Sequence, residues 1–353
     1  MKRKGICILV LFVLVGCLLW YMWYFHTGEQ DSHPYAGSIL LQDVAKKRFI
    51  IVNPNNSNEK VYIDYSCIIS TPSAYIQSPC LVGQSIYFLY TIEDIEKRPK
   101  LMKLTQDGVE EISVSWDADI GTIYPVSLYV YEDKFLVLLG APYGEDNKIV
   151  SIPKNGGMAD VICKDVRAYN KGHIEQIDSS PIPYKDGLIC VNQAGSKIKF
   201  VNNEYEEDMF DLPYKGLNWL KGWYDQDESL LFWSESPNYS QVVALDGTPL
   251  NTLHSYWMWG GLNTSCWDLF GTKDNALLIE LVSTKDYFVF TGFGILNFHE
   301  IGIYDKTTER IMKIGDGRGI QHIEWSDTPY DPVLFERLSH AIDHRCFSDQ
   351  LIK

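Results

Sequence analysis

Two histidines near the end of the chain have the spacing of metal ligands. His340 and His344 lie four residues apart, one turn of the helix predicted there, with Asp343 and Cys346 beside them. Both imidazoles could therefore face one ion. The acid that accompanies two such histidines in a HExxH zinc site is missing, and exposed polar histidines are the simpler interpretation. We predict no metal.

Other signatures of catalysis or cofactor binding are missing from the sequence. There is no GxSxG nucleophile elbow, no P-loop, and no dinucleotide-binding fingerprint after a predicted strand. The acidic segments 117–119 and 225–228 could offer oxygen ligands to calcium, but neither matches an EF-hand loop. The sequence therefore predicts no catalytic residue and no cofactor.

Aromatic residues form the strongest candidate site. Six of the ten tryptophans fall between residues 219 and 267, and the segment YWMWGG, from Tyr256, is flanked by glycine. Exposed rings could stack on sugars or contact apolar side chains of a protein. Packing between neighbouring sheets is the competing interpretation, above all for Trp233. The candidate ligand-binding residues are Trp219, Trp223, Tyr256, Trp257, Trp259 and Trp267.

Cysteines offer a further chemistry, disulfide formation. Six cysteines follow residue 25, and an oxidising compartment would allow fifteen pairings among them. The simplest partners are neighbours in sequence, Cys67 with Cys80 and Cys163 with Cys190, which leaves Cys266 with Cys346. Some could instead be small buried side chains, Cys190 in the apolar run GLICV in particular. The possible disulfide cysteines are Cys67, Cys80, Cys163, Cys190, Cys266 and Cys346.

The first 25 residues indicate the compartment. Three cations, Lys2, Arg3 and Lys4, precede an uncharged apolar run over residues 5–25. A helix of this length spans about 30 Å, the thickness of a bilayer core. Cations before the run predict a cytoplasmic N-terminus. We therefore expect a single-pass protein of the cell membrane with the bulk of its chain extracytoplasmic.

Two alternatives to an uncleaved anchor remain open. The segment Leu14–Cys17 resembles a lipobox, which would be cut before Cys17 and lipidated there, although apolar residues continue beyond it. A cleaved secretory signal would need a small-residue site near its end. All three interpretations place residues 26–353 outside the cytoplasm.

The charge balance argues against one class of partner. The chain has 46 Asp and Glu against 31 Lys and Arg, a formal net charge of −15 at pH 7. An acidic surface repels the phosphate backbone of nucleic acids, and no Lys/Arg-rich segment offsets it. We expect no nucleic-acid partner.

A phrase that recurs about every fifty residues indicates the fold. KIVSIPKNGG, from Lys148, has five relatives in which a polar residue is followed by apolar residues one and four places later, and then by Asn, Asp or Gly. Short apolar runs precede and follow the phrases. Such runs are typical of strands, and the Asp-Gly and Asn-Gly pairs are typical of hairpins. The other phrases begin at Arg48, Lys100, Lys197, Gln241 and Glu300.

Antiparallel units of this length without intervening helices predict an all-β fold, a β-propeller. Six phrases predict six blades, seven are possible because the ends match poorly, and a β-sandwich is the alternative. The run IQHIEWS is expected to close the ring, and VLFERLSHAIDHRCF to form a short amphipathic helix. The predicted divisions are an anchor at 1–25, a polar stalk at 26–36, the propeller at 37–330 and a helical tail at 331–353.

The combination of an apolar run, K-I-x-x-I/L/V, N/D-G and a polar–apolar strand resembles the six-bladed, TolB-type propellers. The similarity is to bacterial extracytoplasmic domains of unknown function in that class. It covers about residues 37–315 and rests on spacing and turns, not on any invariant signature. The resemblance implies a fold and no chemistry, because propellers host binding, scaffolding and several enzyme types.

We therefore expect a membrane-anchored extracytoplasmic propeller that binds a protein or a glycan of the cell envelope. The alternative is an envelope hydrolase or lyase with its site at the mouth of the propeller channel. An enzyme would bring carboxylates or histidines from different blades together there, whereas a binding module would present an aromatic or apolar patch. The sequence favours binding over catalysis.

Overall fold

The computed structural model describes residues 35–69, 71–92, 98–116, 124–140, 147–167, 181–212, 219–222, 229–233, 239–258, 261–265, 275–276, 280–283, 287–293, 299–305, 310–316 and 319–343. Between residues 219 and 300 the description is of the backbone, except at residues 244–248. The predicted anchor and most of the stalk lie outside these ranges. Within them, no helix has the length and apolar character needed to cross a bilayer.

The described strands form six sheets, and the first three contain the following strands in spatial order. The first sheet has β27 (Ile320–Ser326), β1 (Ser38–Asp43), β2 (Arg48–Asn53) and β3 (Asn56–Asp64). The second has β4 (Ala74–Val82), β5 (Ser85–Ile92), β6 (Lys100–Thr105) and β7 (Gly108–Ile112). The third has β8 (Val114–Trp116), β12 (Gly157–Cys163), β11 (Lys148–Pro153), β10 (Lys134–Gly140) and β9 (Tyr124–Val130).

The remaining three sheets and one helix complete the described chain. The fourth sheet has β13 (Ile182–Tyr184), β14 (Gly187–Val191), β15 (Lys197–Val201) and β16 (Glu206–Asp211). The fifth has β17 (Trp219–Gly222), β18 (Ser229–Trp233), β19 (Tyr239–Ala244), β20 (Pro249–Met258), β21 (Gly261–Ser265) and β22 (Asn275–Ala276). The sixth has β23 (Glu280–Ser283), β24 (Tyr287–Phe293), β25 (His299–Asp305) and β26 (Arg310–Asp316), and the helix is α3 (Pro332–Asp343).

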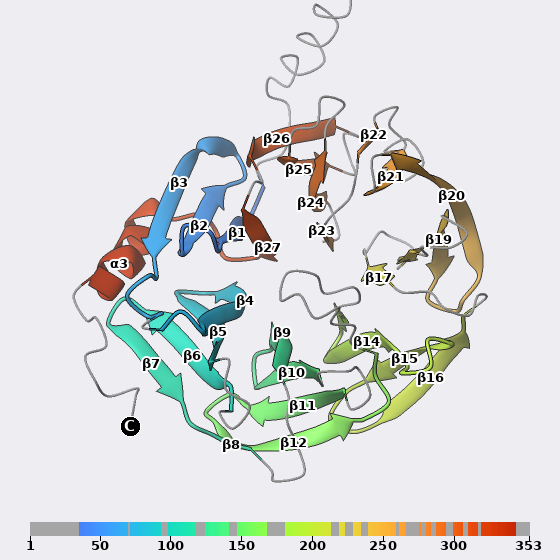
Figure 1. Cartoon of the computed structure of the whole chain (residues 1–353), viewed down its shortest axis with the longest axis horizontal. Helices are drawn as coiled ribbons and strands as arrows, with labels where there is room; N and C mark the ends of the chain where they lie inside the picture. Colours follow the sequence, from blue (N-terminus) through green and yellow to red (C-terminus); the bar gives the residue numbers. More distant parts are fainter. Residues whose placement is uncertain are drawn as a thin grey trace, which may run out of the picture.

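The sheets are arranged radially in a ring (Figure 1). Strands β27, β4, β9, β17 and β23 lie nearest its centre, and β3, β7, β12, β16 and β20 lie at its rim. The repeated phrases form β2, β6, β11, β15, β19 and β25, which are the third strands from the centre in all six sheets. The predicted all-β propeller and its short C-terminal helix are thus confirmed.

Burial along the strands explains their composition. Strand β10 reads KFLVLLG and is buried at every position, because neighbouring sheets cover both of its faces. Strand β3, at the rim, reads NSNEKVYID and is buried only at Val61 and Ile63. Strands in the middle of a sheet therefore have continuous apolar runs, whereas this rim strand is mainly polar.

The ring is closed by the expected strand. β27 pairs antiparallel with β1, so that Trp325 lies opposite Ile39, and Ser38 Oγ donates a hydrogen bond of 2.8 Å to the Thr328 carbonyl, 290 residues away in sequence. Gly37 permits this approach, because a Cβ atom there would lie 2.4 Å from Cζ2 of Trp325. The first sheet is therefore built from both ends of the described chain.

One segment departs from the predicted antiparallel meander. The run VEEISVSW is one of the short strand-like runs that follow the phrases, but it divides at Ser113, and β8 pairs in parallel with β12 of the third sheet. The Gly157 amide donates to the Ser113 carbonyl at 2.9 Å. At Gly156, which has φ of 84°, a Cβ would lie 2.4 Å from that same oxygen. The glycine pair therefore allows the chain that leaves β7 of the second sheet to pair with β12 of the third.

The helix α3 begins at an aspartate cap. Asp331 Oδ1 accepts hydrogen bonds from the amides of Val333 and Leu334, at 3.0 and 3.2 Å, and Pro332 occupies the first helical position. The buried side chains on the helix are Phe335, Leu338 and Ile342. They belong to one apolar cluster with residues of the first and second sheets, so the helix covers the boundary between these sheets at the rim.

Candidate functional site

The predicted aromatic site is only partly within the described backbone. Trp219 lies in β17, whereas Tyr256 and Trp257 lie in β20. Two strands, β18 and β19, separate them in the order of the fifth sheet, so the backbone does not bring these three positions to adjacent strands. Trp223, Trp259 and Trp267 lie outside the described residues. The aromatic site stays a prediction.

The candidate metal ligands are also divided. His340 is exposed on α3, whereas His344 and Cys346 lie outside the described residues. In the described part of the chain, no three His, Cys, Asp or Glu side chains are grouped so that they could hold a metal ion.

Four of the six possible disulfide cysteines have described positions. Cys67 follows β3, and its Sγ lies 3.9 Å from the Ile342 carbonyl of α3. Cys80 lies in β4, Cys163 ends β12 and Cys190 lies in β14, and these three are buried free thiols. Cys266 and Cys346, like the alternative lipidation residue Cys17, lie outside the described residues.

A polar cluster that was not predicted from the sequence lies on the strands nearest the centre. Glu324 of β27 accepts a hydrogen bond of 2.8 Å from the Leu81 amide of β4, and Ser326 Oγ donates to the Leu81 carbonyl at 2.5 Å. Cys80, also in β4, donates from Sγ to the Leu128 carbonyl of β9 at 3.3 Å. Side chains therefore join three successive sheets. We call Glu324, Ser326 and Cys80 the inner cluster.

Two tyrosines of the third sheet extend this linkage to the fourth. Tyr129 donates its hydroxyl to the Pro181 carbonyl at 2.7 Å, and Tyr131 donates to the Gly187 carbonyl at 2.5 Å. Burial raises the pKa of both tyrosines above the ordinary value of 10.0. Both hydroxyls therefore stay protonated near neutral pH and act as donors to the neighbouring sheet.

Burial also determines the charge of the inner cluster. It raises the pKa of Glu324 from 4.5 to about 8, although hydrogen bonds from the Leu81 amide and the Cys80 thiol oppose the shift. Burial, with the nearby Glu324, raises the pKa of Cys80 well above 9.0. The thiol is thus protonated and a poor nucleophile. The cluster is mainly neutral at neutral pH, which suits a structural contact between sheets.

A lysine of the third sheet lies over rings of two sheets. Lys154 Nζ lies 4.7 Å from the ring centroid of Tyr87 in the second sheet and 4.5 Å from that of Phe135 in the third. It also donates to the Tyr131 carbonyl at 2.7 Å. Burial lowers the pKa of Lys154. The cation–π contacts and this hydrogen bond stabilise the charged form of the side chain.

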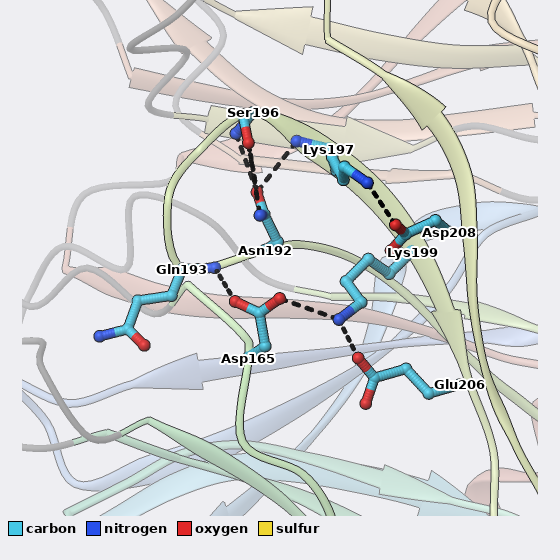
Figure 2. Close-up of polar contacts among 8 residues, drawn as sticks. All are labelled: Asp165, Asn192, Gln193, Ser196, Lys197, Lys199, Glu206 and Asp208. Atoms are coloured by element: carbon cyan, nitrogen blue, oxygen red, sulfur yellow. Dashed lines mark hydrogen bonds and ion pairs between the residues drawn. The ribbon is translucent and has the colours of Figure 1, made fainter.

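A second polar network joins the third and fourth sheets (Figure 2). Lys199 of β15 is buried, and its Nζ contacts Asp165 Oδ2 at 2.9 Å and also Glu206 of β16. Asp165 belongs to the segment after β12, and its Oδ1 accepts the Gln193 amide at 3.0 Å. A buried lysine with two carboxylate partners satisfies the usual requirement for burying a charge.

A turn beside Lys199 is stabilised by its own polar residues. Asn192 Oδ1 accepts hydrogen bonds from the amides of Ser196 and Lys197, at 2.8 and 2.9 Å. At the rim, Lys197 Nζ contacts Asp208 Oδ2 at 2.5 Å (Figure 2). Both polar clusters consist of groups bonded to neighbouring strands, which indicates that they hold sheets in place.

Signals for these contacts were weak in the sequence. Glu324 is the single acid in the apolar run IQHIEWS, and an acid inside a predicted strand near the centre was the available clue. Its partner Leu81 is 243 residues away, and nothing local indicates that pairing.

The strand order and the inter-sheet contacts define this chain as a β-propeller. Solved structures similar to it include TolB from Acinetobacter baumannii, at 12% identity and a TM-score of 0.46, covering 83% of this chain and 67% of that one. Virginiamycin B lyase from Staphylococcus aureus has 12% identity and a TM-score of 0.43, covering 85% and 87%. A protein of unknown function from Bacteroides caccae has 10% identity and a TM-score of 0.36, covering 82% and 98%.

The resemblance to TolB-type propellers is thus present and weak. No family model matches the sequence, and no curated protein matches it. Similarities of this size assign no activity or partner, and the three proteins named above have different descriptions. The fold assignment therefore rests on the strand order of the chain itself.

Proposed function

We propose that this chain is a membrane-anchored, extracytoplasmic binding module for a protein or a glycan of the cell envelope. In this proposal each of the six sheets is one blade of a six-bladed propeller, and residues 5–25 cross the cell membrane. The cations at residues 2–4 support a cytoplasmic N-terminus. Protease added outside intact cells is then expected to degrade the propeller. If the protease can reach the outer face of the cell membrane and the propeller still stays intact, this orientation is wrong.

The single observation that carries the binding role is the use of polar side chains between sheets. In the described part of the chain, Glu324 and Lys199 both have partners that belong to a neighbouring sheet. Polar groups engaged in this way make a rigid scaffold. A rigid scaffold suits a protein that presents binding residues on loops. We assign the ligand contact to the tryptophan-rich segments within residues 219–267.

The test uses the purified full chain in detergent. Binding is measured to insoluble peptidoglycan and, separately, to cross-linkable envelope proteins, for the original protein and for the Trp257→Ala and Trp259→Ala variants. A central aromatic contact contributes about 2 kcal/mol or more to the free energy of binding. We therefore expect at least one of the two tryptophan variants to bind peptidoglycan, or the envelope protein, at least about tenfold more weakly than the original protein does.

The matched control is Tyr62→Ala. Tyr62 is an exposed aromatic residue of β3, half of its surface is accessible, and it lies outside the tryptophan-rich segments. This variant is expected to bind like the original protein. Binding unaffected by either tryptophan change, or reduced equally by Tyr62→Ala, would refute the assignment of the ligand site.

A further inference from the structure

Two cysteine thiols meet between the third and fourth sheets. Cys163 is the last residue of β12, where it lies opposite Ile149, and Cys190 lies in β14, opposite Lys199. Only 2% of Cys163 and 1% of Cys190 is exposed. Both belong to one apolar cluster, with residues from both sheets. Their side chains are hydrogen-bonded to each other, so the two sulfur atoms are neighbours.

Contacts on both sides of the thiols hold the two segments together. The Arg167 amide donates to the Val191 carbonyl at 2.8 Å, which joins the segment after Cys163 to the residue after Cys190. Asp165 lies between Cys163 and Arg167 in sequence. Its carboxylate contacts Lys199 Nζ at 2.9 Å and accepts a hydrogen bond from the Gln193 amide at 3.0 Å (Figure 2). The thiol contact is therefore built into the boundary between sheets.

We propose that Cys163 and Cys190 form a disulfide that covalently joins the third sheet to the fourth. This pairing goes beyond the binding role, and its formation in cells rests on the proposed extracytoplasmic location, where disulfides persist. The positions of the two sulfur atoms do not depend on that location.

The surroundings give the two thiols different roles in forming the bond. The hydrogen bond from Cys190 lowers the pKa of Cys163, helped by the Asp165 amide and the charge of Lys199. The pKa of Cys190 is raised by the same contact and by burial. Cys163 is thus the thiol that more readily supplies a thiolate, and the thiolate is the attacking species in disulfide exchange.

The oxidant is an external disulfide, either a small molecule or a disulfide-bearing protein. The Cys163 thiolate attacks one of its sulfur atoms, forms a mixed disulfide and releases one thiol. The Cys190 thiolate then attacks the Cys163 sulfur and releases the second thiol. Two cysteine thiols lose two electrons and two protons, and the external disulfide becomes two thiols. Because both cysteines are buried, we expect exchange before the sheets pack or during partial opening.

The experiment determines the state of each cysteine in the full chain. Protein isolated from the cell envelope, and reduced protein treated with oxidised glutathione in sub-denaturing urea, are unfolded with N-ethylmaleimide. They are then reduced, labelled with iodoacetamide and analysed by mass spectrometry. We expect Cys163 and Cys190 to carry the second label, and the unreduced digest to contain their linked peptides.

Thermal unfolding provides the second measurement. A bridge closing this loop is expected to raise the Tm of the glutathione-treated protein by roughly 5 °C over its reduced form. The shift should disappear in Cys163→Ser and Cys190→Ser. It should persist in Cys80→Ser, which changes a similarly buried thiol bonded to a backbone carbonyl.

The glutathione-treated protein tests the pairing of the two cysteines, and the envelope-derived protein tests the extracytoplasmic location. If Cys163 and Cys190 carry the first label after glutathione treatment, or are linked to other cysteines, the proposal is overturned. A bond that forms with glutathione but is missing from envelope-derived protein supports the pairing and counts against the extracytoplasmic location. Peptide mapping of the original protein decides the pairing even where a serine variant does not fold.

Discussion

Replacing Phe335 by alanine is expected to lower the free energy of unfolding by about 3–5 kcal/mol, the usual range for a buried phenylalanine. Phe335 is completely buried, and its ring packs against Tyr330 at a centroid distance of 5.6 Å. It lies in the cluster formed by α3 and the first two sheets. Removing the ring leaves a cavity that these rigidly paired strands cannot fill. Urea unfolding, followed by tryptophan fluorescence, measures the loss.

The control variant for this prediction is on the same helix. Val333 is 58% exposed, so Val333→Ala is expected to change the free energy of unfolding by no more than about 0.5 kcal/mol. A loss below about 1 kcal/mol for Phe335→Ala would show that α3 contributes little to the packing of the first two sheets.

The second large effect is a loss of stability as the pH rises. Glu324 has a pKa of about 8 in the folded protein, against an ordinary value of 4.5. Between these values the unfolded chain has released the proton that the folded protein retains, so rising pH favours unfolding. At about 1.4 kcal/mol per pH unit, Glu324 should cost roughly 3–4 kcal/mol of stability between pH 5 and pH 8. Above its folded pKa the loss levels off.

Glu324→Gln separates this contribution from other titrations. The amide keeps the shape of the side chain and an oxygen to accept the Leu81 amide, but it does not ionise. The free energy of unfolding in urea should therefore fall by roughly 3–4 kcal/mol less between pH 5 and pH 8 in Glu324→Gln than in the original protein. Glu110→Gln, which removes an exposed carboxylate paired with Lys103, should retain the original dependence. Identical pH profiles for Glu324→Gln and the original protein would rule out the buried acid as the cause.

Local sequence patterns predicted most of the strands because local physics determines them. The phrases starting at Arg48 and Lys148 became β2 and β11, and the glycines of Asp107-Gly108, Asn155-Gly156 and Asp246-Gly247 have φ of 129°, 84° and 84°. Such dipeptides adopt the positive φ that tight turns require. Periodicity near fifty residues then indicated sheets that cover one another.

Contacts between distant residues were not predictable in the same way. Glu324 meets Leu81 only after the ring has closed, and β8 joins β12 through a backbone contact at Ser113 that no side chain signals. The neighbour rule also gave Cys67 and Cys80 as simple partners, but they pack in different apolar clusters. Spacing along the chain does not determine which face of a sheet a cysteine occupies.

Closure of the first sheet by β27 has a consequence for biosynthesis. The edge of β1 that faces away from β2 must wait for residues 320–326, so a nascent chain carries an apolar strand with one unpaired edge while nearly all of the protein is being made. Contacts between residues so far apart in sequence slow folding, and exposed strand edges recruit other chains. We therefore expect the newly made polypeptide to depend on chaperones until its last strand emerges, and chains that stop short of that strand to aggregate.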